Sequence, residues 1–209
     1  MIGLIKKDLL MIKSNMKIII VMLLVFFIMA AEKNFDISFV PPFITVMLFM
    51  STFSYDEFNK WDGYAATLPS GRKSVVKAKY ITSIILLIAS IIITILLNTL
   101  VGIIDNNLDL NEFVTTLAGC AFGVVLVESI MYPFIFKYGI EKGRIGLFVL
   151  AFAICGLAGL LSNMVDIKIP EQLLTFFNNF WFIVVPIVIL IVLLISYKIS
   201  EKIYLKKEF

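Results

Sequence analysis

The side chains that could do chemistry in this sequence are few and widely spaced. There is no histidine, which removes the usual metal ligand of metalloproteases and the commonest acid–base group near neutral pH. Asp56 and Asp62 are too few to hold the metal ions of a phosphotransferase, and no apolar run has a central lysine to activate a serine. Cys120 and Cys155 lie inside apolar runs and are interpreted as small hydrophobic residues rather than a metal or disulfide pair. The sequence therefore argues against a catalytic site, and no G-x-x-x-x-G-K-[ST] phosphate loop is present for ATP hydrolysis.

The composition explains why reactive residues are so scarce. Hydrophobic residues make up 61% of the 209 residues and charged residues only 16%, whereas a soluble domain is about half apolar and about a quarter charged. A globular core of this size could not bury so much apolar surface. The chain is therefore expected to be an integral membrane protein with a single domain, residues 1–209.

Six segments are apolar enough to cross a membrane as helices. About 20 apolar residues span roughly 30 Å of hydrocarbon, and a helix satisfies its own backbone hydrogen bonds there. A β-barrel is disfavoured because runs such as 81–97 do not alternate apolar and polar residues. We therefore predict an all-α membrane protein whose spans are residues 18–31, 37–55, 80–104, 113–136, 145–162 and 178–198.

The distribution of basic residues predicts the orientation of these spans. With six spans, all of the 18 lysine and arginine residues except Lys33 and Lys168 fall on the side of the N-terminus. Because basic residues concentrate on the cytoplasmic side, both termini are predicted to be cytoplasmic, in a multi-pass protein of the cell (plasma) membrane.

Residues 1–17 are predicted to form an interfacial amphipathic helix. Five apolar residues recur at a spacing of three and four: Ile2, Ile5, Leu9, Ile12 and Met16. Lysines lie between them, so the apolar side is expected to face the membrane and the lysines the anionic headgroups. A cleaved signal peptide is the alternative, and it is disfavoured because the basic region is too long.

The cytoplasmic segment between the second and third spans, residues 56–79, is predicted to contain a short amphipathic helix. Four apolar residues follow helical spacing: Phe58, Trp61, Ala65 and Leu68. Five polar residues occupy the other side: Asp56, Glu57, Asn59, Lys60 and Asp62. Pro69, Ser70 and Gly71 end this helix, and a basic helix follows. Periodicity alone does not separate a docking element for a soluble partner from a helix that only floats on the interface.

The segment from Trp61 to Tyr80, WDGYAATLPSGRKSVVKAKY, resembles the signature loop of small bacterial ABC-2 type transporter permeases. The resemblance rests on a Trp-Asp pair, an aromatic residue, a Thr-Leu-Pro turn, a following arginine and a Lys-Tyr pair. These features are Trp61, Asp62, Tyr64, Thr67, Leu68, Pro69, Arg72, Lys79 and Tyr80. The motif covers about 20 residues, while the rest of the chain matches in layout. Among the family, the chain is most similar to permeases that export phenol-soluble modulins or related amphipathic peptides.

The resemblance implies a permease that forms the path for an exported peptide, driven by a separate ATP-binding subunit. That subunit would bind ATP and Mg²⁺, and this chain would hold no cofactor. The loop helix would dock on the subunit and transmit its motion. The residues expected to couple the two proteins are Asp56, Glu57, Phe58, Trp61, Asp62, Tyr64 and Leu68. Among these, the apolar residues would supply apolar contact or membrane anchorage, and the acidic ones polar contacts to the partner.

Glu128 is the one acidic residue deep in a predicted span, and Tyr132 lies one helical turn beyond it. A charge there costs about 2.5–3.5 kcal/mol on insertion scales, so it should face protein or water. Two roles are therefore open for Glu128, Tyr132 and Asn98. They are either polar points on a translocation path or residues whose interhelical hydrogen bonds fix the packing of the spans. The packing role is favoured for Asn98.

Six spans make too small a ring for a wide peptide path, so a second permease copy or a close relative is expected. The rival interpretations are a non-transporting membrane adaptor or immunity protein and, less favoured, an intramembrane enzyme.

Overall fold

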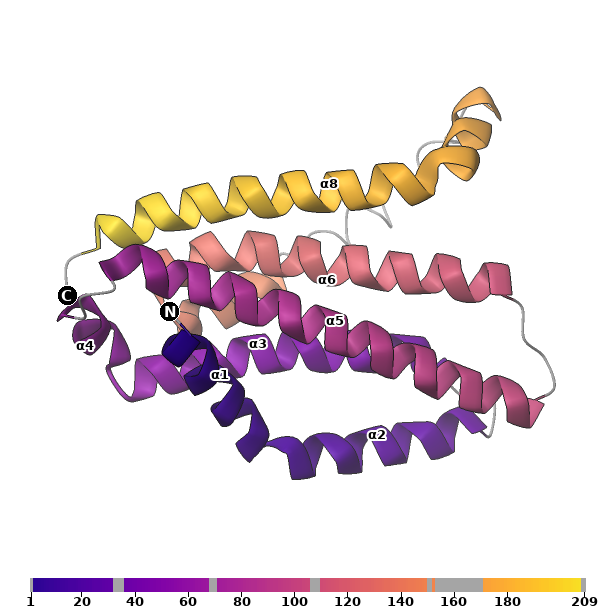
Figure 1. Cartoon of the computed structure of the whole chain (residues 1–209), viewed down its shortest axis with the longest axis horizontal. Coiled ribbons are helices and arrows are strands. Elements are labelled where there is room, and N and C mark those ends of the chain that lie inside the picture. Colours follow the sequence, from indigo (N-terminus) through magenta and orange to yellow (C-terminus); the bar gives the residue numbers. More distant parts are fainter. Residues whose placement is uncertain are drawn as a thin grey trace.

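The computed structural model describes residues 2–31, 36–67, 71–105, 110–149, 152 and 171–207, and within these residues it contains helices and no β-strand. Figure 1 shows the long helices lying alongside one another. They are α3 (Val40–Phe58), α5 (Gly71–Asp105), α6 (Leu110–Tyr138) and α8 (Glu171–Leu205). Four shorter elements accompany them: α1 (Ile2–Ser14), α2 (Met16–Ala31), the 3₁₀ helix η1 (Ile37–Phe39) and α4 (Trp61–Thr67). A further helix covers 140–149. The all-α prediction is confirmed for the described residues.

Helix length and composition decide which of the described helices can cross a membrane. In the described residues, four helices are long and apolar enough to cross a membrane: Ile37–Phe58, Gly71–Ile103, Phe113–Tyr138 and Val184–Leu205. The helices α1 and α2 meet at a bend of 55° and would make a fifth if they form one broken span. The predicted span 145–162 lies outside the described residues except for 145–149 and 152. Four or five spans are therefore supported, and the six-span topology stays a prediction.

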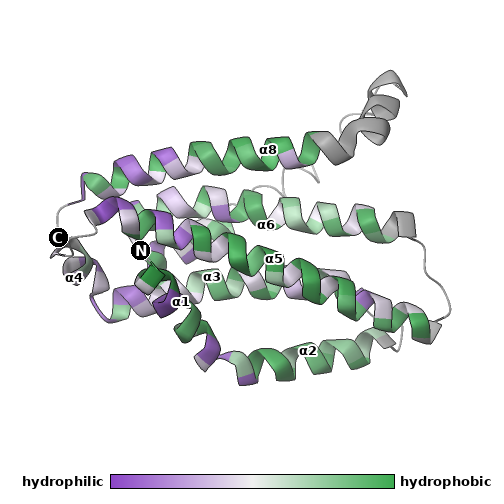
Figure 2. Cartoon of the chain, in the orientation of Figure 1, coloured by the Kyte–Doolittle hydropathy of each residue, from purple (hydrophilic) through white to green (hydrophobic). Residues whose placement is uncertain are grey.

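One end of the helix bundle is polar. Figure 2 shows hydrophobic residues along the long helices and hydrophilic residues at the start of α5 and toward the end of α8. Figure 1 places the start of α1 and the end of α8 at this same end, which we call the polar end. The arrangement agrees with two termini on one side of the membrane, and the side itself stays a prediction.

Aromatic side chains fill the core next to the polar end. Six of them are buried: Phe49, Phe53, Tyr80, Tyr132, Phe136 and Tyr204. The rings of Tyr80 and Tyr132 stack with centroids 3.9 Å apart, and Phe49 meets Tyr132 edge-on at 4.8 Å. Such pairs add about 0.5–1.5 kcal/mol each beyond their burial. Because the rings come from α3, α5, α6 and α8, this core fixes the four long helices relative to one another.

Two backbone features set the helix boundaries at the polar end. Lys60 has a positive φ of 51°, and it separates α3 from α4. Gly139 has a φ of 86° directly after α6, where a Cβ atom would also lie 3.1 Å from the carboxylate oxygens of Glu57. Glycine is the residue that tolerates both conditions. The single helix predicted from Phe58 to Leu68 is therefore wrong at its start, since Phe58 belongs to α3 and α4 begins at Trp61.

Candidate functional site

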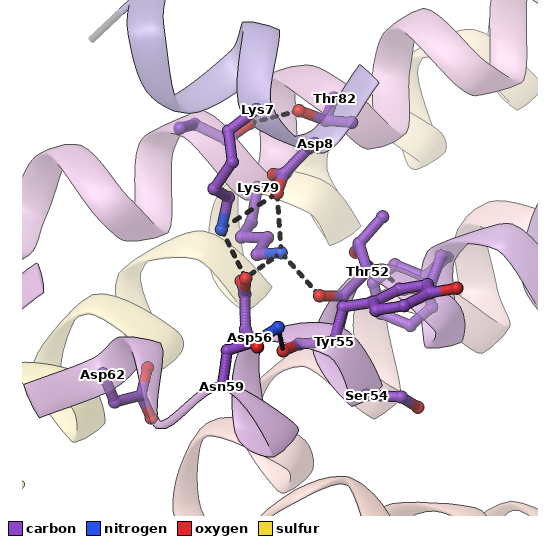
Figure 3. A network of polar contacts seen from close by, with 12 residues as sticks. Lys7, Asp8, Thr52, Ser54, Tyr55, Asp56, Asn59, Asp62, Lys79 and Thr82 are labelled. Atoms are coloured by element: carbon purple, nitrogen blue, oxygen red, sulfur yellow. Dashed lines mark hydrogen bonds and ion pairs between the residues drawn. The ribbon is translucent and has the colours of Figure 1, made fainter. Parts of the chain in front are cut away.

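A buried cluster of four charged side chains lies at the polar end, where α1, α3 and α5 meet (Figure 3). The Lys79 ammonium on α5 lies 3.1 Å from an oxygen of Asp8 and 2.6 Å from an oxygen of Asp56. It also donates to the carbonyl of Thr52 at 3.2 Å. Lys7 pairs with Asp56 and lies 3.3 Å from Asp8. Three acceptors thus meet the three N–H groups of Lys79, which satisfies this buried cation.

The cluster balances two positive charges against two negative ones. The side chains of Asp8, Asp56 and Lys79 are only 2%, 7% and 5% exposed, whereas that of Lys7 is 20% exposed. Two aromatic rings assist, since Lys79 lies 4.7 Å from the ring centre of Phe53 and Lys7 lies 4.3 Å from that of Trp61. Buried charges of this kind tolerate the loss of one member poorly, because the remaining charges stay buried without compensation.

The cluster changes the interpretation of α1. Its inward face consists of Leu4, Asp8 and Ile12, which are buried against the bundle at a spacing of four residues. Ile2, expected on the membrane-facing side with Ile5 and Leu9, is 83% exposed. A helix is present over Ile2–Ser14, shorter than the predicted 1–17, and its interfacial position stays a prediction. Ile12, expected on the membrane-facing side, lies instead with Asp8 in the face that packs on the bundle.

The three acidic residues expected to contact a partner all have partners within the chain. Asp56 belongs to the charge cluster. The Glu57 carboxylate accepts from the backbone N–H of Ile140 at 2.7 Å, at the start of the 140–149 helix, where an acceptor is favourable. Asp62 accepts from the Tyr204 hydroxyl at 3.1 Å and from the Lys207 ammonium at 3.0 Å. These contacts join α3 and α4 to later parts of the chain.

The aromatic residues of the predicted coupling segment differ in exposure. Phe58 is 86% exposed and Tyr64 is 59% exposed. Trp61 is partly buried beneath Lys7, and its ring centre lies 5.1 Å from that of Tyr64. Leu68 and Pro69 lie outside the described residues. We call the exposed side chains of Phe58, Asn59, Lys60 and Tyr64 the α4 ledge.

The three described residues of the turn and basic helix each reach a distant segment. Arg72 donates to the backbone carbonyls of Leu205 and Lys207, at 3.1 and 2.9 Å. Lys79 joins the charge cluster on α1 and α3. The Tyr80 hydroxyl lies 2.7 Å from that of Ser196 and 2.9 Å from that of Ser200 on α8. In this chain these residues tie α1, α3 and α8 to α5.

The candidate path residues are held between helices. The Ser83 hydroxyl donates to the carboxylate of Glu128, which is 1% exposed. The Tyr132 hydroxyl donates to the carbonyl of Lys79 at 2.9 Å. Asn98 accepts from Ser38 at 3.1 Å. These contacts match the packing alternative, and a role in a path stays a proposal.

Apolar grooves and a polar cavity lie among the described helices. The larger groove, of about 630 Å³, runs between α2 and α3, and the second, of about 550 Å³, lies among α2, α3 and α6. Met22, Phe43 and Ile44 line both grooves. The polar cavity, of about 280 Å³, lies at the polar end beside Asp56 and Lys79. Within the described ranges, no group of three or more potential metal ligands is present.

Sequence reasoning missed three residues of the polar end. Asp8 had a signal, since it is a lone acidic residue among lysines on the predicted helix 1–17. Tyr204 and Lys207 had none, because Asp62 lies 142 and 145 residues before them in the sequence.

Comparison with protein families identifies the family of this chain. A family model described as "ABC-2 family transporter protein" matches residues 3–205, nearly the whole chain. No curated protein and no solved structure matches. The matched residues include the signature segment Trp61–Tyr80 and nearly all of the helices. No matching protein supports the likeness to modulin exporters.

Proposed function

Because the chain belongs to the ABC-2 transporter family and is a membrane-spanning permease, we propose that it forms the translocation path of an exporter. A separate ATP-binding subunit supplies the energy and holds ATP and Mg²⁺. The observation that carries the proposal is the family match over residues 3–205. Its setting is the plasma membrane, with the polar end in the cytoplasm, which the positions of the basic residues support.

We further propose that the ATP-binding subunit docks on the α4 ledge. Helix α4 packs against α3 and α5, and Ala65 on its inner face is fully buried in the aromatic core. A displacement of α4 would therefore reach two long helices directly. Exposed aromatic residues such as Phe58 and Tyr64 are the type that supplies most binding energy at protein interfaces. Lys60 is exposed beside them.

The charges of the polar end favour a partner with acidic groups. Asp56, Glu57 and Asp62 already have partners within the chain, and the α4 ledge itself presents aromatic and basic side chains. The surface that receives α4 is therefore proposed to be apolar with an acidic rim.

The docking proposal is tested with the double variant Phe58→Ala Tyr64→Ala. Each truncated aromatic anchor typically weakens binding by more than 1 kcal/mol, so we expect at least about a tenfold loss of affinity for the ATP-binding subunit. Binding is measured by copurification and titration in nanodiscs. Trp61 and Asp62 are poorer targets, because they contact Lys7 and Tyr204 within the chain.

The matched control is Phe39→Ala Phe43→Ala. These two phenylalanines are 55% and 57% exposed and lie near the opposite end of α3. The control should leave binding unchanged. Wild-type affinity of the Phe58→Ala Tyr64→Ala variant would show that the partner docks elsewhere.

For the cargo, we propose an amphipathic, membrane-active peptide moved outward. Support comes from the resemblance of the signature loop and from the two apolar grooves, in which Met22 and Phe43 are shared lining residues. Methionine and phenylalanine adapt to varied apolar partners, and few fixed polar groups are present to recognise a sugar or nucleotide. The aromatic core leaves one chain little room for a wide path. A second permease copy, identical or closely related, is therefore proposed to complete it.

A further inference from the structure

The end of α8 is fastened to α4 and to the start of α5 by polar contacts. Asp62 on α4 receives the Tyr204 hydroxyl on one carboxylate oxygen, at 3.1 Å, and the Lys207 ammonium on the other, at 3.0 Å. Arg72, in the first turn of α5, donates to the backbone carbonyls of Leu205 and Lys207, at 3.1 and 2.9 Å. The chain following the last span is thus held from two sides.

The contacts continue along α8 toward the membrane. The Lys73 ammonium lies 3.2 Å from the carboxylate of Glu201, and the Tyr80 hydroxyl lies 2.9 Å from that of Ser200. Tyr204 is fully buried, and its ring centre lies 5.2 Å from that of Phe136. The last turns of α8 are therefore part of the packed polar end.

Asp62 provides a polar link between α4 and the end of α8. In the described part of the chain, α4 packs against α3 and α5 but not directly against α8. The Asp62 carboxylate bridges the gap between the two helices by its bonds to Tyr204 and Lys207. Arg72 supports this link because its guanidinium donates to the carbonyl of Leu205, the last residue of α8, and to that of Lys207 two residues beyond it. The last carbonyls of a helix lack intrahelical donors and favour a nearby cation.

We propose that Asp62 and Arg72 are positioning residues that make α8 follow α4. When the ATP-binding subunit displaces α4, Asp62 carries the displacement to Tyr204 and Lys207, and so to the last membrane span. Helix α4 itself packs against α3 and α5 in the described part of the chain, and Asp62 adds the polar connection to α8. The inference rests on the proposed function, since it takes the ATP-binding subunit as the source of the motion.

The first experiment uses the permease alone and does not depend on the ATP-binding subunit. Spin labels are attached to cysteines at Thr67 on α4 and Lys202 on α8, both exposed, in a protein whose Cys120 and Cys155 are replaced by alanine. We expect a single narrow distance distribution in nanodiscs, which broadens in the variant Asp62→Ala Arg72→Gln. The exposed Lys77 on α5 provides the control Lys77→Gln, which should leave the width unchanged.

The second experiment adds the ATP-binding subunit and ATP, with labels at Tyr55 on α3 and Lys202 on α8. We expect nucleotide to shift this distance in the wild type and not in Asp62→Asn, a mild variant that keeps the side-chain size. The exchange Asp62→Lys Lys207→Asp should restore the shift. Transport of a fluorescent amphipathic peptide per ATP hydrolysed should fall about 2- to 30-fold in Asp62→Asn, while binding of the subunit is retained.

The outcomes separate the inference from the proposed function. An unchanged width for Asp62→Ala Arg72→Gln would overturn the fastening of α8. The distance distribution could broaden in Asp62→Ala Arg72→Gln while nucleotide still shifts the α3–α8 distance in Asp62→Asn as it does in the wild type. That result would overturn the transmission of motion through Asp62. If no ATP-binding subunit associates with the wild-type permease, the proposed function fails, together with the transmission that rests on it, and the first experiment still decides the fastening.

Discussion

Replacing Lys79 with methionine is the sharpest test of the buried charge cluster. Methionine keeps much of the apolar stem but removes the ammonium that meets Asp8, Asp56 and the carbonyl of Thr52. The two aspartates, 2% and 7% exposed, would then share Lys7 alone. Breaking a buried ion pair by removing one partner costs about 3–5 kcal/mol. Because Lys7 is 20% exposed and water screens part of the cluster, we expect the lower end, about 3 kcal/mol.

The free energy of unfolding is measured by denaturant titration of the detergent-solubilised protein. Lys77→Met is the matched control, because Lys77 is exposed on the same helix, and it should change stability by no more than about 0.5 kcal/mol. The double variant Asp56→Asn Lys79→Met leaves Lys7 paired with Asp8 at 3.3 Å. It should therefore be more stable than Lys79→Met alone. Equal losses for Lys79→Met and Lys77→Met would refute the buried cluster.

Two further predictions concern the polar end. Gly139→Ala should destabilise the protein by about 1–2 kcal/mol, because the φ of 86° disfavours a side chain and the new Cβ would lie 3.1 Å from Glu57. The control in the same titration is Gly63→Ala, since Gly63 has open space around it. Equal free energies of unfolding for the two variants would contradict the predicted strain at Gly139. A cysteine at Ser70 should react with a membrane-impermeant reagent only when the cytoplasmic side is accessible, and labelling from outside intact cells would reverse the predicted orientation.

The long helices could be predicted from the sequence because each is a local pattern. Runs such as 80–104 and 113–136 contain enough consecutive apolar residues to require a membrane helix, and α5 and α6 contain them. The break at Lys60 was harder to foresee, because helical spacing continues from Phe58 to Ala65 although the backbone turns between them. Periodicity records which residues share a face, and it does not show where one helix ends.

The contacts of the polar end could not be predicted, because they join residues far apart in the sequence. Asp8 and Lys79 are 71 residues apart, and Arg72 reaches carbonyls 133 and 135 residues later. Asp56, Glu57 and Asp62, which the sequence analysis expects to face a partner, each bind within the chain, and their role in coupling stays a prediction. A charged residue in a single sequence gives no sign of whether its partner is internal or external.

The central claim, an ABC-2 permease driven by a separate ATP-binding subunit, is tested most directly by reconstituted transport. Proteoliposomes containing the permease and the ATP-binding subunit that copurifies with it are supplied with a fluorescent amphipathic peptide on the side of that subunit. The account predicts that the peptide accumulates in the opposite compartment only when ATP and Mg²⁺ are present and both proteins are included. Peptide movement by the permease alone that ATP does not change would contradict it.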